Sequence, residues 1–548
     1  MPDDAEIAPP RRLDVAAYLD RFAWHPEPEL IGFRDERASR DAVSRLGDAT
    51  WAVTLDYLYD HAARRAMGPA GDYETTRRDF FEGAGGNGGA GPGAGPVAAP
   101  VAPSTAADVL EEFRARLAPV QLNAQHPRNF GYFTPPPLLM SIAAELLAQV
   151  TNQGVDVWHA GPTGAFVEEE VVRWLADLIG YGPESFGLLT SGGVMANFIA
   201  MAIARDVHLA QLARIDHPPR GAELESVRVY ASDQAHFSIG RALDELGFPP
   251  GTLAIIPADD RFHLRATSVS ETISRDRAAG LTPLAICAVA GSTNTGSVDP
   301  IAELADIADH EGLWLHVDAA YGGAARLSQR DAARVPDLER ADSVTVDPHK
   351  WFFQAYDIGG LIVRDGRHLE ETFGGRLPEY YRGGEGRAVE SDAQDDPGQL
   401  NFYKLGFEGT RRWRALKLWM SWKHLGTSGL GRLVEITDDL AAHLARRCAE
   451  SADFEAFPET PELSVVCFRH LPGGPGVAAA LPAQDLDAHQ DRLQAALERS
   501  GEGWLTTTRL RGATYLRAGI VNYLATEDDI DRLLDDLRRL ASGPEAGR

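Results

Sequence analysis

The sequence predicts an α/β protein: a mostly parallel sheet with helices on both faces, followed by a smaller α+β domain. The main observation is that seven short apolar runs alternate with amphipathic helical stretches over residues 126–425. The chain is 548 residues long, which suggests about three or four domains rather than one. Its apolar content of 44% is ordinary for a soluble globular protein and is sufficient for a large core.

The apolar runs that we expect to form strands are FGLLT, VRVYAS, LAIIPA, LAICAVAG, LWLHVD, SVTVD and GGLIVRD. Helical stretches such as VMANFIAMAIARDVHLAQLAR and IAELADIADHEG separate several of them. Strands that alternate with helices in this way typically form a parallel sheet whose two faces are both covered. We therefore predict a seven-stranded, mostly parallel sheet in a large domain over residues 126–425.

The segments on either side of this domain are predicted to be smaller. Residues 1–125 form a helical segment that contains a Gly- and Pro-rich run over 83–104, expected to be a flexible insertion. A helix capped by Ser104 or Thr105 follows it. A long helix over 411–426 leads into a small α+β domain over 426–548. Its strands are expected at SVVCFRHL and TYLRAGIVN, and its closing helix at DDIDRLLDDLRRL.

Charge and cysteine content narrow the class of protein. The formal net charge of -27 argues against nucleic acid and against an anionic membrane surface as partners. No uninterrupted apolar run reaches the ~20 residues of a membrane helix, and the N-terminal residues lack the apolar stretch of a signal peptide. The three cysteines are few and far apart, which favours free thiols in a reducing compartment. We therefore expect a cytoplasmic protein.

Lysine is rare in this chain. Only four of the 53 basic residues are lysines: Lys350, Lys404, Lys417 and Lys423. Because Arg serves wherever a generic positive charge is enough, a Lys is a candidate for chemistry that Arg cannot do, such as forming an imine with a carbonyl. Three of the four lie within 404–423, where no such role is evident. Lys350 is the remaining candidate, although scarcity alone does not single it out.

Glycines and small polar residues follow several of the apolar runs. In an open parallel sheet, ligands bind outside the carboxyl ends of the strands. After FGLLT, Gly192 and Gly193 open directly into a long helix, whose N-terminal N–H groups suit a phosphate. VRVYAS leads to His236, and LAICAVAG leads to Thr293. Taken singly, an ordinary turn and a structural histidine are the simpler interpretations.

Two further runs end in ionisable groups. LWLHVD ends in Asp318, a carboxylate that is costly to bury without a donor or a cation. SVTVD ends in Asp347, and His349 and Lys350 follow. Pyridoxal phosphate (PLP) needs a helix N-terminus for its phosphate, a carboxylate for its pyridine nitrogen, and a Lys whose amine can lose its proton, which burial promotes. Its ring also needs an imidazole or aromatic on one face and a small residue, here Ala320, on the other. The sequence therefore predicts PLP as the cofactor, and no metal site.

Four segments, TSGGVMAN, YASDQAHFS, HVDAAYGG and DPHKW, resemble the signature segments of the PLP-dependent group II amino-acid decarboxylases. The likeness extends from about His126 to Arg469. The family includes aromatic-L-amino-acid, tyrosine, glutamate and diaminobutyrate decarboxylases. The resemblance implies the type I (aspartate aminotransferase-like) fold, a homodimer with sites near the subunit interface, and decarboxylation of an L-amino acid to its amine and carbon dioxide.

The resemblance also implies roles for individual residues around the cofactor. Lys350 bonds to the aldehyde, Asp318 pairs with the ring nitrogen, and His236 stacks on the ring. The remaining cofactor contacts that it implies are Ala320 on the other face, Thr293 near the phenolic oxygen, and Gly192, Gly193 and Val194 at the phosphate, helped by Asp347 or His349. Many relatives carry a Ser or Thr hydroxyl where this chain has Val194, so its phosphate must depend on backbone donors.

A Gly-rich acidic segment after the last strand of the large domain is the expected lid of the site. Pro378, Glu379 and Tyr380 resemble the lid of the family, whose Tyr returns a proton to the substrate α-carbon. His236 or His349 are expected to assist. Relatives that make aldehydes carry Phe at this position, so Tyr380 favours simple decarboxylation. Tyr381 is the alternative proton donor, and a passive surface loop is the alternative to a lid.

The resemblance places six substrate contacts in two segments: Phe130, Tyr132, Phe133, Thr134, Asp156 and Trp158. The aromatic residues and Trp158 suit an aromatic substrate, although core packing is an equally simple interpretation of the first segment. Asp156 lies near a position that is aromatic in several relatives, and resembles the diaminobutyrate type. We prefer an aromatic L-amino acid, with a diamino or acidic amino acid as the alternative.

Other activities remain open at this point. An aminotransferase on the same fold would use the same Lys and Asp, and would normally add an Arg for the substrate carboxylate. An aldehyde synthase is a second alternative, and a non-catalytic protein of the same fold a third. A nicotinamide-binding enzyme is disfavoured because SGGVMAN lacks the third spaced glycine and no acidic residue follows at the usual distance.

Overall fold

The computed structural model describes residues 14–32, 37–61, 65–66, 73–83, 99–375 and 400–543. They belong to two compact units. The first comprises the described residues of Met1–Asn129 and Ala496–Trp504, and the second those of Phe130–Ala495 and Leu505–Arg548. The predicted boundaries of the three segments, near residues 125 and 425, remain a prediction.

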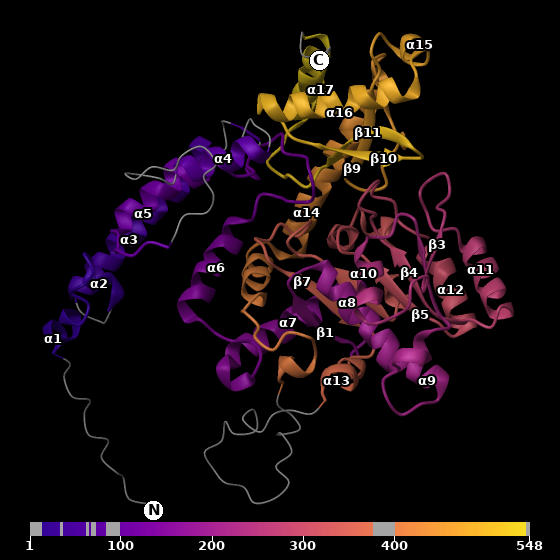
Figure 1. Ribbon diagram of the computed structural model, residues 1–548, viewed down its shortest axis with the longest axis horizontal. Helices are drawn as coiled ribbons and strands as arrows, with labels where there is room; N and C mark the ends of the chain where they lie inside the picture. Colours follow the sequence, from indigo (N-terminus) through magenta and orange to yellow (C-terminus); the bar gives the residue numbers. More distant parts are fainter. Residues whose placement is uncertain are drawn as a thin grey trace, which may run out of the picture. The chain divides into compact units, whose positions relative to one another are not determined.

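The first unit consists of helices. Those described are α1 (Val15–Asp20), α2 (Pro28–Ile31), α3 (Arg37–Leu55), α4 (Tyr73–Gly83) and α5 (Ala106–Glu112) (Figure 1). The Thr105 hydroxyl accepts a hydrogen bond from the Asp108 amide (3.2 Å), so the predicted start and cap of α5 are confirmed. Most of the Gly- and Pro-rich run lies outside the described residues, and its flexibility stays a prediction.

The second unit contains a seven-stranded sheet that is mostly parallel, as predicted. Its strands are β1 (Phe186–Thr190), β2 (Val227–Ser232), β3 (Leu253–Ile256), β4 (Thr282–Val289), β5 (Trp314–Asp318), β6 (Ser343–Val346) and β7 (Gly359–Val363). The strand order is β1-β7-β6-β5-β4-β2-β3. Only β7 runs antiparallel to both of its neighbours, β1 and β6. Each of the seven apolar runs forms one strand.

Helices cover both faces of this sheet, and successive strand residues pack into two separate cores. In β2, for example, Val229 and Ala231 pack into one core and Tyr230 into the other. The core that contains Tyr230 is completed by α7 (Pro162–Ile179), α11 (Ala266–Ala278), α12 (Ile301–Glu311) and α14 (Ala415–Glu450). The opposite core is completed by α8 (Gly193–Ile203), α10 (Ser238–Glu245) and α13 (Arg367–Phe373) (Figure 1). Burial on both faces explains why these strands are continuous apolar runs in the sequence.

Helix α8 continues through residues 204–213, and this stretch of chain is long and apolar enough to span a membrane by length and composition alone. Of its most apolar window, 67% is buried inside the protein. Because α8 packs against the sheet, its apolar character is explained by the core.

Helix α14 is longer than the predicted helix over 411–426. It continues to Glu450, with a break in helical geometry at Gly426 (φ 68°, ψ 171°). A glycine adopts a positive φ without steric cost, so the break is tolerated at this position. The chain returns to helical geometry after Gly426. The helix leads to a second, antiparallel sheet of order β10-β11-β9-β8.

The second sheet consists of β8 (Phe454–Ala456), β9 (Val465–His470), β10 (Thr506–Leu510) and β11 (Ala513–Gly519). The predicted strands correspond to β9 and β11, and the predicted closing helix corresponds to α17 (Glu527–Ser542). Strands β8 and β10 and helix α16 (Ala483–Ser500) were not predicted. The short β8 and the mostly polar β10 lack the apolar pattern that identified the strands of the large sheet.

A buried ion pair fixes the end of β1, which leads into the glycine turn. Arg411 pairs with Glu168 of α7, and both side chains are at most 1% exposed. Arg411 also donates to the Leu189 carbonyl (2.7 Å), and the Leu189 amide donates to Glu168 (2.9 Å). The pair therefore joins α7, β1 and the segment before α14.

Replacing Arg411 by Met should lower the free energy of unfolding by about 3–5 kcal/mol, because it leaves the Glu168 carboxylate buried without its cation. Denaturant unfolding followed by tryptophan fluorescence measures this loss. The matched control is Arg367→Met, which removes an exposed ion pair with Asp365 and should change stability little. Equal effects of the two substitutions would contradict the account of the buried pair.

Candidate active site

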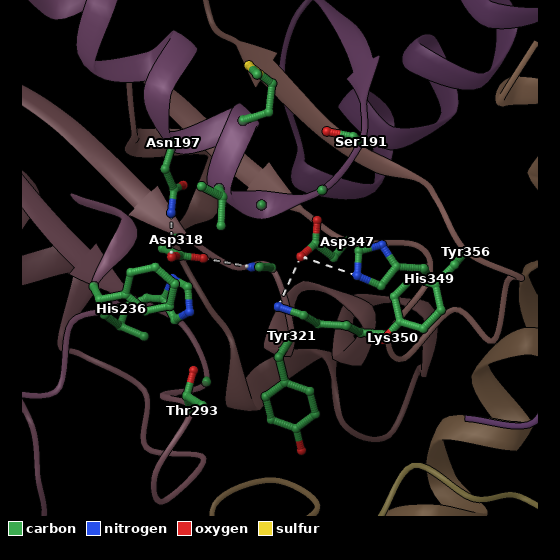
Figure 2. Close-up of a pocket in the computed structure, with 18 of the residues that line it drawn as sticks. Ser191, Asn197, His236, Thr293, Asp318, Tyr321, Asp347, His349, Lys350 and Tyr356 are labelled. Atoms are coloured by element: carbon green, nitrogen blue, oxygen red, sulfur yellow. Dashed lines mark hydrogen bonds and ion pairs between the residues drawn. The ribbon is translucent and has the colours of Figure 1, made fainter. Parts of the chain in front are cut away.

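A cavity of about 370 Å³ opens at the carboxyl edge of the large sheet. The residues that follow β1, β2, β4, β5 and β6 converge on it, as expected for an open parallel sheet. The predicted cofactor-site residues that line it are Gly192, Gly193, Val194, His236, Thr293, Asp318, Ala320, Asp347, His349 and Lys350 (Figure 2). The structure thus brings together every described residue predicted to contact the cofactor, while the contacts themselves remain a prediction.

Lys350 lies in the turn after β6 with its amine in the cavity. Its Nζ is 2.9 Å from Oδ2 of Asp347 (Figure 2). Burial alone would lower the pKa of the Lys350 amine, but the carboxylates of Asp347 and Asp318 outweigh it, so the pKa is raised. Burial thus favours loss of the proton from this amine, as predicted, but in the chain by itself the two carboxylates outweigh burial and favour the ammonium form.

Asp318 ends β5 and is buried against hydrogen-bond donors. Asn197 Nδ2 donates to its Oδ2 (2.8 Å), and the Ala320 amide donates to its Oδ1 (3.1 Å). The Asn197 side-chain oxygen in turn accepts from the Thr345 hydroxyl of β6 (2.7 Å). These bonds satisfy the buried carboxylate and fix its direction.

Asn197 was not singled out from the sequence, although it lies one helical turn beyond the glycine turn. Its side-chain oxygen also lies 3.0 Å from Nε2 of His316. Burial lowers the pKa of His316 to about 4, so this imidazole is neutral at pH 7. Asn197 therefore supports Asp318 by linking α8 to β5 and β6. A side-chain amide on the first turn of the helix was the signal available in the sequence.

His236 and Thr293 lie on the part of the cavity near Asp318 (Figure 2). Nδ1 of His236 shares a hydrogen bond with the Ser238 hydroxyl (2.8 Å). Burial lowers the pKa of His236, so its ring is neutral at pH 7 and suited to stacking. The Thr293 carbonyl accepts from Nε of Arg517 (2.8 Å), a buried residue of β11. Arg517 was not identified from the sequence, and it ties the Thr293 loop to the second sheet.

The glycine turn and Asp347 form the opposite end of the cavity. A Cβ at Gly193 would lie 2.8 Å from Oδ2 of Asp347, and one at Gly359 would lie 2.4 Å from the Cα of Gly192. Only glycine therefore fits this close approach of backbones. Oδ1 of Asp347 is buried and has no hydrogen-bond partner in the part of the chain that the structure describes. The turn thus presents the first amides of α8 beside an unsatisfied polar atom.

His349 and Tyr356 lie beside Lys350. Nδ1 of His349 is 2.6 Å from the Ile358 carbonyl oxygen, and burial lowers the pKa of the imidazole. The ring of Tyr356 packs against His349 with centroids 4.6 Å apart. Tyr356 lines the cavity and was missed in the sequence, because nothing in the pattern after DPHKW indicates which residue returns to the site.

The six predicted substrate contacts are absent from the lining of this cavity in the part of the chain that the structure describes. Two of them lie directly behind it. Phe133 stacks on Tyr321 (4.1 Å between centroids), and the Thr134 hydroxyl lies 3.2 Å from that of Tyr356. Both partners line the cavity.

The other four predicted contacts are placed less directly. Phe130 is fully buried, and Tyr132 is largely exposed. The amide of Trp158 donates to the Asn401 side chain, and the carbonyl of Asp156 accepts from the Tyr403 amide. Tyr380 and Tyr381 lie outside the described residues. Direct contact of any of these residues with substrate remains a prediction.

The side chains present fit PLP. They offer a helix N-terminus and a glycine turn for a phosphate, an amine for an aldehyde, and a buried carboxylate for a ring nitrogen. The neutral imidazole of His236 and the methyl group of Ala320 suit the two faces of an aromatic ring. Fold and site together define a PLP-binding enzyme of the type I fold.

Comparisons with known proteins agree with this class. Residues 93–471 match the pyridoxal-dependent decarboxylase conserved domain. An aromatic-L-amino-acid decarboxylase of Bacillus atrophaeus is 32% identical over 421 residues, covering 76% of this chain and 82% of that protein. An L-2,4-diaminobutyrate decarboxylase of Rhizobium meliloti (strain 1021) is 31% identical over 417 residues, covering 76% of this chain and 78% of that protein. The chain belongs to the pyridoxal-dependent decarboxylase family.

A solved structure agrees with the fold. The crystal structure of Oryza sativa TDC with PLP and tryptamine is 24% identical, covers 93% of this chain and 99% of that chain, and has a TM-score of 0.80. The predicted type I fold is thereby confirmed, as are PLP as the cofactor and amino-acid decarboxylation as the class of reaction.

Covalent attachment of PLP to Lys350 predicts a clear chemical signature. Borohydride reduction should fix the cofactor to the peptide that contains Lys350, and mass spectrometry should find it there. Lys350→Ala should carry no fixed cofactor, because the only amine in the described cavity is gone. Lys423→Ala, which removes a half-exposed lysine, is the matched control and should label like the native protein. Labelling of the Lys350→Ala variant at another lysine would contradict the assignment.

Proposed function

We propose that this decarboxylase acts on an aromatic L-amino acid. The main observation in its support is which charged side chains line the cavity. Among its described lining residues, the only carboxylates are Asp318 and Asp347, and the only amine is Lys350. All three have a cofactor role in this proposal, so no charged group is left for the side chain of a diamino or acidic substrate.

Aromatic groups at the cavity support the same substrate class. Phe237 and Tyr356 line it and are both more than half exposed, which is unusual for large apolar side chains. Asp156, the residue that favoured a diamino substrate, is absent from the described lining. An aromatic side chain would cover Phe237 and Tyr356 without requiring a partner charge.

The proposed roles follow from the positions of the groups. When bound, PLP supplies an electron-accepting ring for the bond between Cα and the substrate carboxylate. Asp318, held by Asn197 and the Ala320 amide, keeps a proton on the ring nitrogen. His236 and Ala320 would hold the ring between them, and the Lys350 amine would be the group that bonds to the aldehyde.

The other predicted roles complete the proposal. Gly192, Gly193 and the Val194 amide bind the phosphate at the start of α8, and Thr293 lies beside the ring. Tyr380 returns a proton to Cα, with Tyr381 as the alternative donor and His236 or His349 assisting. His349 suits this role because the lowered pKa leaves its imidazole neutral at pH 7, when it accepts or relays a proton.

We further propose that the protein is a cytoplasmic homodimer with its sites near the subunit interface. Helix α6 (Leu139–Thr151) exposes four large apolar side chains: Leu139, Leu146, Leu147 and Val150. Exposed apolar surface of this kind is typical of a protein interface. Phe237 and Tyr356, which line the cavity, are also exposed. The three cysteines are buried free thiols, which supports a reducing compartment.

Transamination is a second candidate because of Arg517. Its guanidinium is buried and lies 4.8 Å from the Phe133 ring centroid, and its Nη2 has no hydrogen-bond partner among the described residues. A free guanidinium nitrogen near Thr293 is the type of group that an aminotransferase uses for a substrate carboxylate. Its absence from the cavity lining favours the structural role described above.

The substrate proposal is tested by measuring carbon dioxide, amine and keto acid from the PLP-loaded protein with a panel of L-amino acids. We expect carbon dioxide and amine from aromatic members, with kcat/KM at least about 100-fold above that for 2,4-diaminobutyrate or glutamate, because an unpaired charge would be buried in the site. A preference for a charged substrate would contradict the aromatic assignment. Keto acid as the main product would instead support transamination.

A further inference from the structure

Lys417 is one of only four lysines in the chain, and it does not line the cavity described above. It lies in the first turn of α14, and its side chain is 1% exposed. Its Nζ donates to the carbonyl of Ala355 (3.1 Å) and to that of Asp357 (3.0 Å). It also pairs with Oε1 of Glu145 on α6 at 2.5 Å. Each of the three hydrogens of the ammonium group therefore has an acceptor.

The arrangement of these acceptors explains why a lysine stands here in a chain rich in arginine. An ammonium group is a compact charge whose three donors point in different directions, whereas a guanidinium is a planar fork. Two carbonyls of one loop and a carboxylate of another helix surround a single nitrogen. Arg412 also pairs with Glu145, so this carboxylate has a second cation. The two carbonyls thus depend on Lys417 more than the carboxylate does.

The two carbonyls belong to the residues on either side of Tyr356, which lines the cavity and is 56% exposed. Two further contacts hold the same loop. The Asp357 side chain pairs with Arg412 (3.0 Å), and the Ala355 amide donates to the Ser141 hydroxyl of α6 (3.0 Å). The backbone around Tyr356 is therefore held from α6 and from the residues around the start of α14.

The side chain of Tyr356 is restrained less firmly than its backbone. Its ring lies beside that of His349, with centroids 4.6 Å apart, at the end of the cavity that contains Lys350 (Figure 2). Its hydroxyl lies 3.2 Å from that of Thr134, which is long for a hydrogen bond between hydroxyls. These are weak restraints on a side chain that is more than half exposed, so the direction of the ring depends on its backbone.

We propose that Lys417 is a positioning residue: by holding the carbonyls on both sides of Tyr356, it keeps the Tyr356 ring at the cavity, where the ring contacts the side chain of the substrate. The inference rests on the proposed aromatic substrate, because an aromatic side chain is the group that covers Tyr356 in that proposal. Lys417 itself lies behind the loop, so its effect on substrate binding passes through Tyr356.

The experiment is a double-mutant cycle on the PLP-loaded protein with Lys417→Met, Tyr356→Ala and the double variant. Methionine removes the donors and keeps an apolar chain in the buried space, and Arg412 remains to pair with Glu145. We expect each single substitution to raise KM about tenfold with kcat little changed, because a contact made equally before and during the reaction is lost. The double variant should match Tyr356→Ala within about twofold. Effects that multiply in the double variant would overturn the proposal.

A purely structural role of Lys417 predicts a different result. Loss of folded protein lowers the apparent kcat and leaves KM unchanged, and this outcome would overturn the proposal. The matched control is Lys423→Met on the same helix, which removes a half-exposed lysine that pairs with Glu170 at 3.3 Å. It should leave both constants unchanged.

The cycle is measured with the amino acid of the panel that has the highest kcat/KM. A preference for a charged amino acid would contradict the aromatic assignment, whereas multiplied effects in the cycle would overturn the role of Lys417 with any substrate. The two failures are therefore distinguishable.

Binding of phenethylamine, an aromatic amine, gives a readout without turnover. Its dissociation constant, followed by the absorbance of the PLP-loaded protein, should rise in Lys417→Met by the same factor as KM, with no further rise in the double variant. If Lys417→Met does not fold, Lys417→Arg replaces it in the cycle. Arginine keeps the charge beside Glu145, but its planar fork does not match both carbonyls, so the same loss is expected. Native binding by Lys417→Arg would overturn the proposal, because the charge alone would then be sufficient.

Discussion

The carboxylate of Asp318 sets the constraint around which the site is arranged. It is placed at the end of a strand buried on both faces, where an unsatisfied charge is too costly to keep. Asn197 from α8 and the Ala320 amide supply its hydrogen bonds. Asn197 also accepts a hydrogen bond from the Thr345 hydroxyl. The hydrogen bonds around Asp318 therefore hold α8, β5 and β6 together. The same helix presents its N-terminus to the phosphate end of the cavity.

A second constraint is that two carboxylates share one amine. Asp318 and Asp347 approach Lys350 from different strands and together raise the pKa of its amine. In the free protein this arrangement favours the charged form of the Lys350 amine.

Much of the large domain is predictable from the sequence, for a physical reason. Strands buried on both faces are continuous apolar runs, and the residues after most of these runs lie at one edge of the sheet. The positions of Asp318, Lys350 and the glycine turn at that edge can therefore be predicted from the sequence alone. The second sheet is harder to predict because β8 has only three residues and β10 is mostly polar.

Residues that reach the site from elsewhere than those strand ends could not be predicted from the sequence. Tyr356 and Arg517 reach the cavity and its Thr293 loop through the path of the loop before β7 and through the packing of the second sheet. The charge state of Lys350 could not be predicted either, since it depends on distances to carboxylates on two strands. Substrate contacts predicted from Phe133 and Thr134 lie one layer behind the cavity, where they support Tyr321 and Tyr356.

We propose that Asp318 keeps the cofactor ring nitrogen protonated while Lys350 holds the cofactor. Nitrogen-15 NMR of the protein loaded with PLP labelled at the ring nitrogen tests it most directly. We expect the chemical shift of a protonated ring nitrogen in the native protein, and that of an unprotonated one in Asp318→Asn. An unprotonated ring nitrogen in the native protein, or the same shift in both proteins, would contradict it.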